Sequence, residues 1–224
     1  MLNKNSNYTL VMICLNEIDG IKYISDGVNK HLHLLNDIIF IDGGSTDGSI
    51  EMAKKNGWSV FLQDKNNMGV LNGIKLGLDK CKTDYVIFFS PDNNCKPEAI
   101  PALISEADKG NDLVIASRYK DGAKSQDDTL ISGFGNWMFT KLANIFFGGK
   151  FTDLLGGYRC FNKTLLKKFN IKINSAIHTQ LAIGCIRNNI PYAEIGADEP
   201  KRIGGVSQLN PLINGSWEVF TITE

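Results

Sequence analysis

Two acidic segments follow apolar runs and carry the residue types of a ligand site. In IDGGSTDGS, Asp42 ends an apolar run and a glycine-rich turn follows it. In SPDNN, Asp92 and Asn94 follow the apolar residues 85–89. In α/β proteins ligands bind beyond the carboxyl ends of the strands, so acids at these places are positioned to contact one. We expect a nucleotide at Asp42.

The spacing of Asp92 and Asn94 favours a divalent cation. Residues two apart on an extended backbone point their side chains to the same side. Mg²⁺ needs only one or two protein oxygens, because water and substrate phosphates complete its coordination. Each acid also has a purely structural interpretation: Asp42 and Asp92 as turn formers, and Asp47 as a helix N-cap.

Composition indicates a globular protein and excludes several classes. The chain has 224 residues, 43% of them hydrophobic, which is enough to bury a sizeable core. Its 24 basic and 24 acidic residues cancel, so no nucleic-acid-binding surface is expected. The five cysteines have no CxxC spacing, which argues against a zinc site or a disulfide framework and favours a reducing compartment.

The sequence predicts neither a secretory signal nor a membrane-spanning helix. The apolar stretch near the N-terminus is short for a signal, and no run reaches about 18 apolar residues. We therefore expect a cytoplasmic protein, with peripheral contact at the inner face of a membrane left open.

Strand-like and helix-like runs alternate along the first half of the chain. The apolar runs 9–15, 37–42, 58–63, 84–90 and 111–119 predict strands. Helices are predicted from about Gly20, after Asp47, over residues 70–79 and from Pro97. Near-continuous apolar strands indicate burial on both faces, hence a mostly parallel sheet with helices on each side.

Beyond residue 119 the pattern changes. A polar loop over 120–128 has the length of a lid, and an amphipathic stretch follows up to Gly148. Further helices are predicted over about 163–169 and 176–188, and a strand over 191–197. Residues 137–151 are interpreted as a helix packed on the core, with contact to a lipid or a membrane surface as the alternative.

An ordered set of motifs makes the chain resemble family 2 glycosyltransferases, which have the GT-A nucleotide-diphosphosugar transferase fold. The motifs are CLNE (14–17), IDGGSTDGS (41–49), NNMGVLNGIKLG (66–77), SPDNN (90–94), ASRY (116–119), TDLLGGYRCF (152–161) and EPKRIGG (199–205). The last two are most similar to the branch with dolichyl-phosphate mannose synthases and other polyprenyl-phosphate glycosyltransferases. The resemblance implies one GT-A domain over 1–224, with a nucleotide-sugar half (about 1–119) and an acceptor half (about 120–224).

The resemblance also implies the site residues. Asp92 and Asn94 would hold Mg²⁺ or Mn²⁺, and Asp92, His178 and Arg159 are the catalytic candidates. Phosphates would be surrounded by Arg118, Arg159, Lys201 and Arg202. The donor-binding candidates share a place in the motifs at strand ends and loops: Leu15, Glu17, Asp42, Ser45, Asn72, Pro91, Asp92, Arg118, Lys201 and Arg202.

Two positions depart from the family pattern. Ser90 stands where the first aspartate of the DxD metal motif is usual, which removes a carboxylate from the metal site. His178 lies where an acidic residue is expected near the acceptor. A hydroxyl acceptor needs a general base, and the unperturbed pKa of histidine, about 6.5, suits that task. A lipid phosphate is already ionised and needs cations instead of a base. The alternative for His178 is a structural role, which is more common for a lone histidine.

The basic residues also have structural interpretations. Arg118 and Arg159 would pair with acids of neighbouring loops, and Lys201–Arg202 would be a solvated turn. The glycines that follow, Gly204 and Gly205, favour a loop that closes over phosphate.

We expect an inverting glycosyltransferase that moves a sugar from a nucleotide-diphosphate donor to a polyprenyl phosphate or glycan acceptor. A membrane partner and a homodimer are left open. The main alternative is a catalytically impaired nucleotide-sugar-binding protein, which Ser90 and the missing acidic base would suit. A nucleotidylyltransferase would carry a basic glycine-rich loop after the first strand, and a dehydrogenase a GxGxxG there; CLNEIDG has neither.

Overall fold

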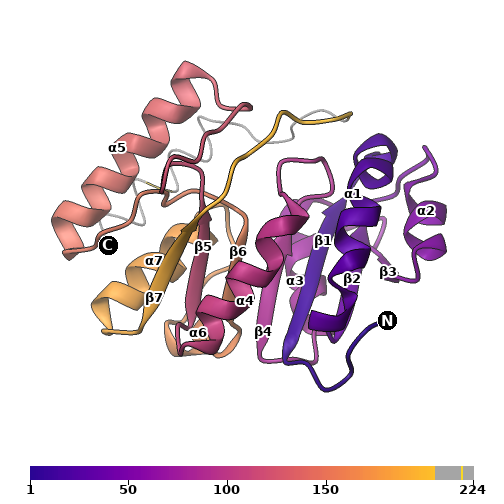
Figure 1. Cartoon of the computed structure of the whole chain (residues 1–224), viewed down its shortest axis with the longest axis horizontal. Coiled ribbons are helices and arrows are strands. Elements are labelled where there is room, and N and C mark those ends of the chain that lie inside the picture. Colours follow the sequence, from indigo (N-terminus) through magenta and orange to yellow (C-terminus); the bar gives the residue numbers. More distant parts are fainter. Residues whose placement is uncertain (205–217, 219–224) are drawn as a thin grey trace.

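In the part of the chain that the structure describes, a seven-stranded sheet forms the centre, in the order β3-β2-β1-β4-β6-β5-β7 (Figure 1). The computed structural model describes residues 1–204 and Glu218. Every neighbouring pair of strands is parallel except the two that β6 makes, with β4 and with β5. The strands are β1 (Tyr8–Cys14), β2 (Asp37–Asp42), β3 (Ser59–Leu62), β4 (Tyr85–Phe89), β5 (Leu113–Ser117), β6 (Arg159–Asn162) and β7 (Tyr192–Gly196).

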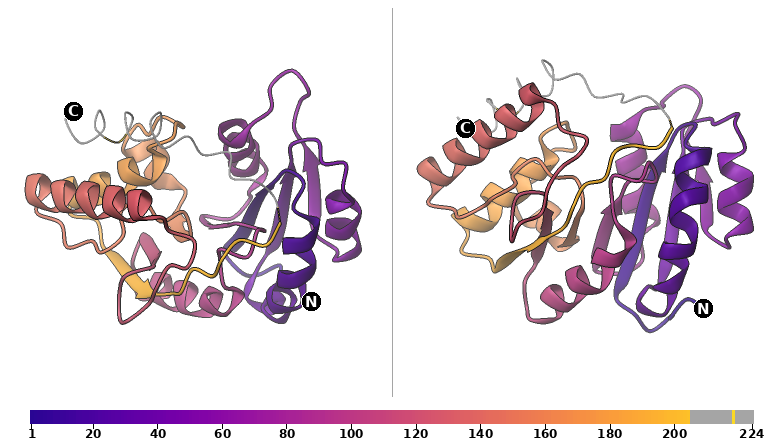
Figure 2. Two further views of the ribbon diagram at one scale, coloured as in Figure 1. Left: turned by 90° about the horizontal axis from the view of Figure 1, so that it is seen from above. Right: turned by 45° about the horizontal axis from the view of Figure 1, so that its top comes forward.

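Helices cover both faces of the sheet, as predicted (Figure 2). One face packs against α1 (Ile18–Lys30), α2 (Ser49–Lys55) and α4 (Ile100–Asp108). The other packs against α3 (Val70–Lys80), α6 (Thr164–Lys168) and α7 (Ile177–Arg187), and α5 (Leu130–Phe147) contacts α7. The α/β fold with a mostly parallel sheet is therefore confirmed.

The central strands β1, β2 and β4 are largely apolar because both of their faces are buried. Leu10 and Met12 of β1 pack into the core beside α1, while Val11 packs into the core beside α3. Burying an aliphatic side chain contributes roughly 1.5–3 kcal/mol, so a strand buried on both sides is stabilised along its whole length. The same pattern in β2 and β4 holds their carboxyl ends at one edge of the sheet.

The structure differs from the sequence prediction at four places. Strand β6 was not predicted. The helix expected from about Gly20 begins at Ile18, and the helix from Pro97 begins as a 3-10 turn (Pro97–Ala99) before α4. Asp47 is not the N-cap of α2, because Gly48 (φ 97°) holds that place.

The carboxylate of Asp47 instead joins the starts of two helices. Its Oδ2 accepts a hydrogen bond from the backbone N–H of Ile18 (3.0 Å), at the first turn of α1. Its Oδ1 accepts from the N–H and hydroxyl of Ser49, at the start of α2. Unpaired N–H groups at a helix start need such partners, so one aspartate stabilises two helix ends.

Helix α5 has one buried and one exposed apolar face. Asn136, Phe139, Thr140 and Ala143 face the protein. Six large apolar residues are exposed: Leu130 (95%), Ile131 (77%), Phe134 (62%), Trp137 (56%), Ile145 (74%) and Phe146 (66%). The predicted packing on the core thus describes one face only. Among the described residues no helix has the length and apolar character needed to cross a membrane.

The segment that follows β7 runs across the carboxyl-end edge of the sheet toward α1 (Figures 1 and 2). A parallel bridge between Ser125 and Glu199 joins it to the loop 120–129. Asp92 O accepts a hydrogen bond from the N–H of Ile203 (2.9 Å). The segment therefore covers the loop that follows β4. Gly205, which was predicted to belong to a closing loop, lies outside the described residues.

Candidate active site

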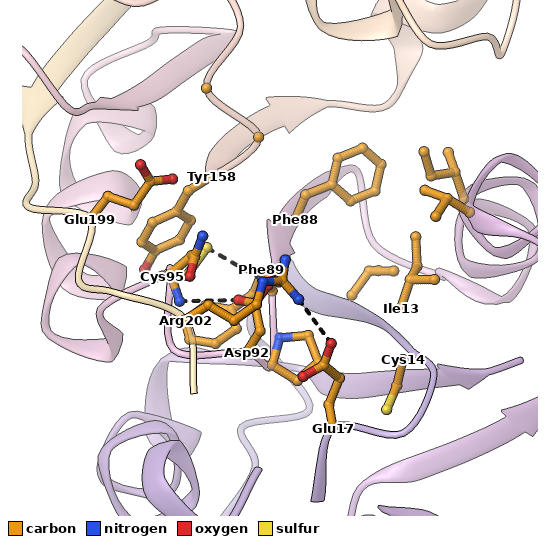
Figure 3. A pocket seen from close by; sticks show the side chains of 18 of the residues that line it. Ile13, Cys14, Glu17, Phe88, Phe89, Asp92, Cys95, Tyr158, Glu199 and Arg202 are labelled. Atoms are coloured by element: carbon orange, nitrogen blue, oxygen red, sulfur yellow. Dashed lines mark hydrogen bonds and ion pairs between the residues drawn. The ribbon is translucent and has the colours of Figure 1, made fainter. Parts of the chain in front are cut away.

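A cavity of about 610 Å³ lies at the carboxyl ends of β1, β4 and β5 (Figure 3). Parallel strands bring their loops to this edge, which explains why motifs far apart in the sequence meet there. Eight of the predicted site residues line it: Leu15, Glu17, Pro91, Asp92, Asn94, Arg118, His178 and Arg202. Among the described residues, five predicted ones lie outside its lining: Asp42, Ser45, Asn72, Arg159 and Lys201.

The carboxylate of Asp42 is fully buried and bound by its own loop. Its Oδ1 accepts hydrogen bonds from the N–H groups of Gly44 and Ser45, each at 2.7 Å. Its Oδ2 accepts from the Ser45 hydroxyl at 2.6 Å. Asp42 and Ser45 therefore act as turn formers here, which is the structural interpretation of the motif. Nucleotide contact by Asp42 stays a prediction.

The Asp42 loop is joined to the loop after β1. The N–H of Asn16 donates to Ser45 Oγ (2.8 Å), and Asn16 Oδ1 accepts from the N–H of Thr46 (2.9 Å). These bonds fix Leu15 and Gly43 at the cavity wall. Leu15 is 44% exposed, which leaves an apolar surface open to a ligand.

Asp92 has the features of a cation ligand. Its side chain is buried, and Oδ1 accepts a hydrogen bond from the N–H of Asn94 (3.0 Å). Gly20 of α1 packs so closely on Pro91 and Asp92 that a Cβ would not fit, which fixes the loop. Asn94 Oδ1 is buried without a hydrogen-bond partner among the described residues. Carboxylate and amide oxygens are suitable ligands for Mg²⁺ or Mn²⁺, so the residues fit the ion.

The ligand set is nevertheless sparse. Among the described residues, no group of three or more His, Cys, Asp or Glu side chains could hold a metal. Ser90, at the cavity wall, supplies no carboxylate. An ion at this place would depend on water and substrate phosphates for the rest of its coordination.

Arg202 lies between Asp92 and Glu17 (Figure 3). Its Nη2 is 2.6 Å from Asp92 Oδ2, and its Nη1 donates to Glu17 Oε1 at 3.0 Å. The remaining oxygen of Glu17, Oε2, has no partner among the described residues. One guanidinium thus serves two buried carboxylates. Burial raises the pKa of Glu17 to about 7, and the shared Arg202 opposes the shift only in part.

Arg118 is bound by acids. Its Nε and Nη2 donate to Asp153 at 2.7 and 2.9 Å in a bidentate pair. Its Nη1 lies 3.4 Å from Glu199 and 3.6 Å from Asp128. Burial alone would raise the pKa of Asp153, but hydrogen bonds and charge from Arg118 lower it. Arg118 therefore ties together β5, the loop 120–129 and the segment after β7.

Arg159 is fully buried and does not reach the cavity lining. Its guanidinium donates to the carbonyl oxygens of Gly156 (3.0 Å from Nε), Leu154 (3.2 Å) and His178 (2.9 Å). Burial lowers its pKa to about 10, so it stays charged at neutral pH. The predicted phosphate contact is corrected: Arg159 holds the loop 152–158 against the start of α7.

His178 lines the cavity beside Phe88. Burial, with a smaller contribution from Arg159, lowers its pKa well below the usual value. Its Nδ1 is buried without a partner among the described residues. The imidazole is therefore neutral at pH 7 and a weak base.

The other predicted donor residues make local contacts. Asn72 Nδ2, in the first turn of α3, donates to Asn67 Oδ1 in the loop before this helix. Lys201 is exposed, and its carbonyl oxygen accepts from Asn93 Nδ2 (2.9 Å).

Sequence reasoning missed Asp127, Asp153 and Glu199 as members of the site. Asp127 Oδ2 accepts from Asn94 Nδ2 (2.8 Å), which sets the direction of the Asn94 amide. Asp153 and Glu199 bind Arg118. The motifs that contain Asp153 and Glu199, TDLLGGYRCF and EPKRIGG, were recognised. Only the basic residues in or near these motifs were interpreted as functional.

The fold defined by this sheet, with its site at the strand ends, is that of the nucleotide-diphosphosugar transferases. Glucosyl-3-phosphoglycerate synthase from Mycobacterium tuberculosis, solved with Mn²⁺, UDP and phosphoglyceric acid, superposes with a TM-score of 0.72. The match covers 97% of this chain and 78% of that one at 19% identity. At this identity the likeness establishes the fold alone.

The family model for glycosyl transferase family 2 matches residues 9–169. The chain belongs to this family, which confirms the prediction. Glycosyltransferase AglJ of Haloferax volcanii is 25% identical over 182 residues, covering 80% of this chain and 59% of that protein. The undecaprenyl-phosphate 4-deoxy-4-formamido-L-arabinose transferase of Shewanella sediminis is 25% identical over 205 residues, covering 88% and 58%. The chain thus spans less than two thirds of the length of these relatives.

Proposed function

We propose that the chain is an inverting glycosyltransferase that moves a sugar from a nucleotide-diphosphate donor to a polyprenyl phosphate or glycan acceptor. One observation carries this proposal: the buried Asp92 carboxylate stands next to the Arg202 guanidinium in a cavity at the strand ends. A carboxylate is a ligand for a divalent cation, and a guanidinium fork matches phosphate oxygens. Side by side they suit a metal-bound diphosphate.

The donor would lie along the edge of the sheet. Leu15 and Gly43 line the part of the cavity that we propose for the base and ribose, and Arg202 joins Glu17 to Asp92. Asp42 and Ser45 shape this wall through the turn that they close. We therefore assign them a positioning role beside the predicted nucleotide contact of Asp42, and retain direct donor contact for Leu15, Glu17, Pro91 and Arg202.

Asp92 and Asn94 would hold Mg²⁺ or Mn²⁺, and Arg202 would add a second positive charge. When bound, the ion would stabilise the negative charge that builds on the departing diphosphate. Support comes from the orphaned Asn94 Oδ1 and from the synthase of the same fold, which was crystallised with Mn²⁺ and with Mg²⁺ beside UDP.

A polyprenyl phosphate is the acceptor that this site supports best. His178 is neutral and weakly basic, which suits an acceptor that is already ionised better than a hydroxyl that must lose a proton. The Shewanella sediminis relative is named for transfer involving undecaprenyl phosphate. His178 would then help to shape the acceptor side of the cavity.

We further propose that residues 1–119 and 120–224 act as one GT-A domain at the cytoplasmic face of a membrane. The exposed apolar face of α5, with Phe134 and Trp137 in contact, would lie against the lipid. Co-sedimentation with vesicles of mixed neutral and anionic lipids tests this. The double variant Phe134→Ser/Trp137→Ser should bind vesicles several-fold more weakly. Tyr23→Ser, on the exposed surface of α1, should leave vesicle binding unchanged.

The function is tested by incubating the protein with a panel of UDP- and GDP-sugars and Mn²⁺. Short-chain polyprenyl phosphate and an alkyl glycoside serve as the two acceptors. We expect transfer to the phosphate, loss of turnover with EDTA, and inversion at the anomeric carbon by NMR. The proposal would be contradicted if no donor gave transfer or donor hydrolysis above background.

The second candidate is a nucleotide-sugar-binding protein without catalysis. Ser90 and the Arg202–Asp92 pair favour it, because both weaken the metal site. Calorimetric binding of a nucleotide sugar together with no turnover, under conditions in which a known transferase is active, would establish this alternative.

A further inference from the structure

Arg202 occupies the place where a cation would contact Asp92. Asp92 Oδ1 is taken by the N–H of Asn94, so Oδ2 is the oxygen free to bind a metal. That oxygen is 2.6 Å from Arg202 Nη2. The two side chains are 24% and 4% exposed, so water weakens this ion pair little.

The backbone around Arg202 is fixed independently of its side chain. Asp92 O accepts from the N–H of Ile203 (2.9 Å), and Lys201 O accepts from Asn93 Nδ2 (2.9 Å). Both neighbours of Arg202 are thus bound to the loop after β4. The guanidinium can change partners by rotating its side chain while the segment stays in place.

A divalent ion and the guanidinium cannot both use Asp92 Oδ2 at low cost. Like charges a few ångströms apart repel, and the repulsion is strong where water is excluded. A diphosphate changes this balance, because its oxygens offer the guanidinium a bidentate partner. Arg202 would move from Asp92 to phosphate, and the carboxylate would become free for the ion.

We propose that Arg202 is the resident cation of this site, that it competes with the divalent ion for Asp92, and that the donor diphosphate releases it. The diphosphate step rests on the proposed function; the competition does not. Metal and nucleotide would then each strengthen the binding of the other by the same factor. The missing carboxylate at Ser90 makes the ion more dependent on this coupling.

The first measurement uses Mn²⁺ alone, with free Mn²⁺ followed by electron paramagnetic resonance. Arg202→Gln should bind Mn²⁺ about tenfold more tightly than the wild-type chain, within the usual range of coupling between sites. The double variant Arg202→Gln/Asp92→Asn should lose this gain, which places the ion on Asp92. Lys54→Gln removes a charge from the exposed surface of α2 and should leave the affinity unchanged. Circular dichroism checks that each variant is folded.

The second measurement compares Mn²⁺ affinity with and without UDP or GDP. In the wild-type chain the nucleotide should raise Mn²⁺ affinity strongly, and in Arg202→Gln this enhancement should shrink about tenfold. Arg202→Lys keeps the charge but not the planar guanidinium. Its enhancement should lie between that of the wild-type chain and that of Arg202→Gln.

The outcomes separate the two proposals. Equal or weaker Mn²⁺ binding by Arg202→Gln, or no detectable binding by that variant, overturns the inference even where nucleotide and turnover are normal. Tighter Mn²⁺ binding by Arg202→Gln with no nucleotide bound by any form supports the competition and contradicts the glycosyltransferase proposal. If the nucleotide raises Mn²⁺ affinity by the same factor in the wild-type chain and in Arg202→Gln, the proposed release of Arg202 by the diphosphate is wrong.

Discussion

The carboxyl ends of β2 and β4 carry the same sequence signal, and the structure uses it in two ways. Asp42 and Asp92 each follow a buried apolar strand and precede a turn. The oxygens of Asp42 are bound by groups of its own loop. One oxygen of Asp92 is bound locally, and the other is reached by Arg202 from the far end of the described chain. The partner of the second oxygen thus distinguishes a carboxylate that only closes its own turn from one that also contacts a distant segment.

The largest effect is expected from Asp92→Asn. The substitution removes a charge from the proposed metal site but keeps the acceptor oxygen for Asn94, so turnover should fall about 10²–10³-fold with little loss of stability. Donor turnover and thermal unfolding are measured together. Asp26→Asn, on the exposed surface of α1, is the control. Unchanged turnover of Asp92→Asn would mean that Asp92, like Asp42, has only a structural role at its strand end.

Asp42→Ala should have the opposite balance. It leaves the N–H groups of Gly44 and Ser45 without their partner, which should lower the free energy of unfolding by about 2–3 kcal/mol. Urea denaturation measures the loss, with Asp79→Ala on exposed α3 as the control. A stable Asp42→Ala protein that no longer binds nucleotide would make Asp42 a ligand contact after all.

Glu17 should make stability depend on pH. Burial raises its pKa from 4.5 to about 7, so between these values the native state binds more protons than the unfolded state. The stabilisation is complete below pH 4.5 and is lost as the pH rises through 7. The pKa of about 7 already includes the opposing effect of Arg202, and partial hydration limits the contribution to about 1–2 kcal/mol.

Glu17→Gln should remove this part of the pH dependence. Chemical denaturation between pH 5 and 8 should show a smaller decline for the variant than for the wild-type chain. Glu51→Gln, on the exposed surface of α2, should leave the profile unchanged. Parallel profiles for the wild-type chain and Glu17→Gln would mean that Arg202 neutralises Glu17 fully.

The smallest effect is expected from Ser90→Asp. A second carboxylate at the end of β4 should raise Mn²⁺ affinity several-fold, or about 1 kcal/mol, because repulsion from Asp92 opposes part of the gain. The same titration used for Arg202 measures it. Ser105→Asp, on exposed α4, adds an equal charge away from the site. No gain would show that Ser90 does not limit the metal site.

The sequence predicted most of the fold because local patterns decide it. The apolar runs of β1, β2 and β4 are buried on both faces, and such runs are visible without any knowledge of their partners. Strand β6 was missed because it has four residues and includes Arg159, whose charge disguises a buried position.

The site was predicted less completely because its contacts join distant segments. Motif recognition placed Asp92, Glu17 and Arg202 in one site, but not the sharing of one guanidinium by two carboxylates. Arg159 was assigned to phosphate because a charged residue in a motif suggests a ligand. Three carbonyl oxygens satisfy it instead.

The reversed direction of β6 has a consequence for how this architecture can diversify. The chain leaves β5 and re-enters the sheet through β6 from the same edge, because the two strands are antiparallel neighbours. The excursion between them, residues 118–158, contains α5 and ends at the cavity wall. Its length can change at small entropic cost without shifting the register of any strand. Under the proposed function, we expect insertions or exchanges there to change the acceptor specificity while residues 1–117 stay constant.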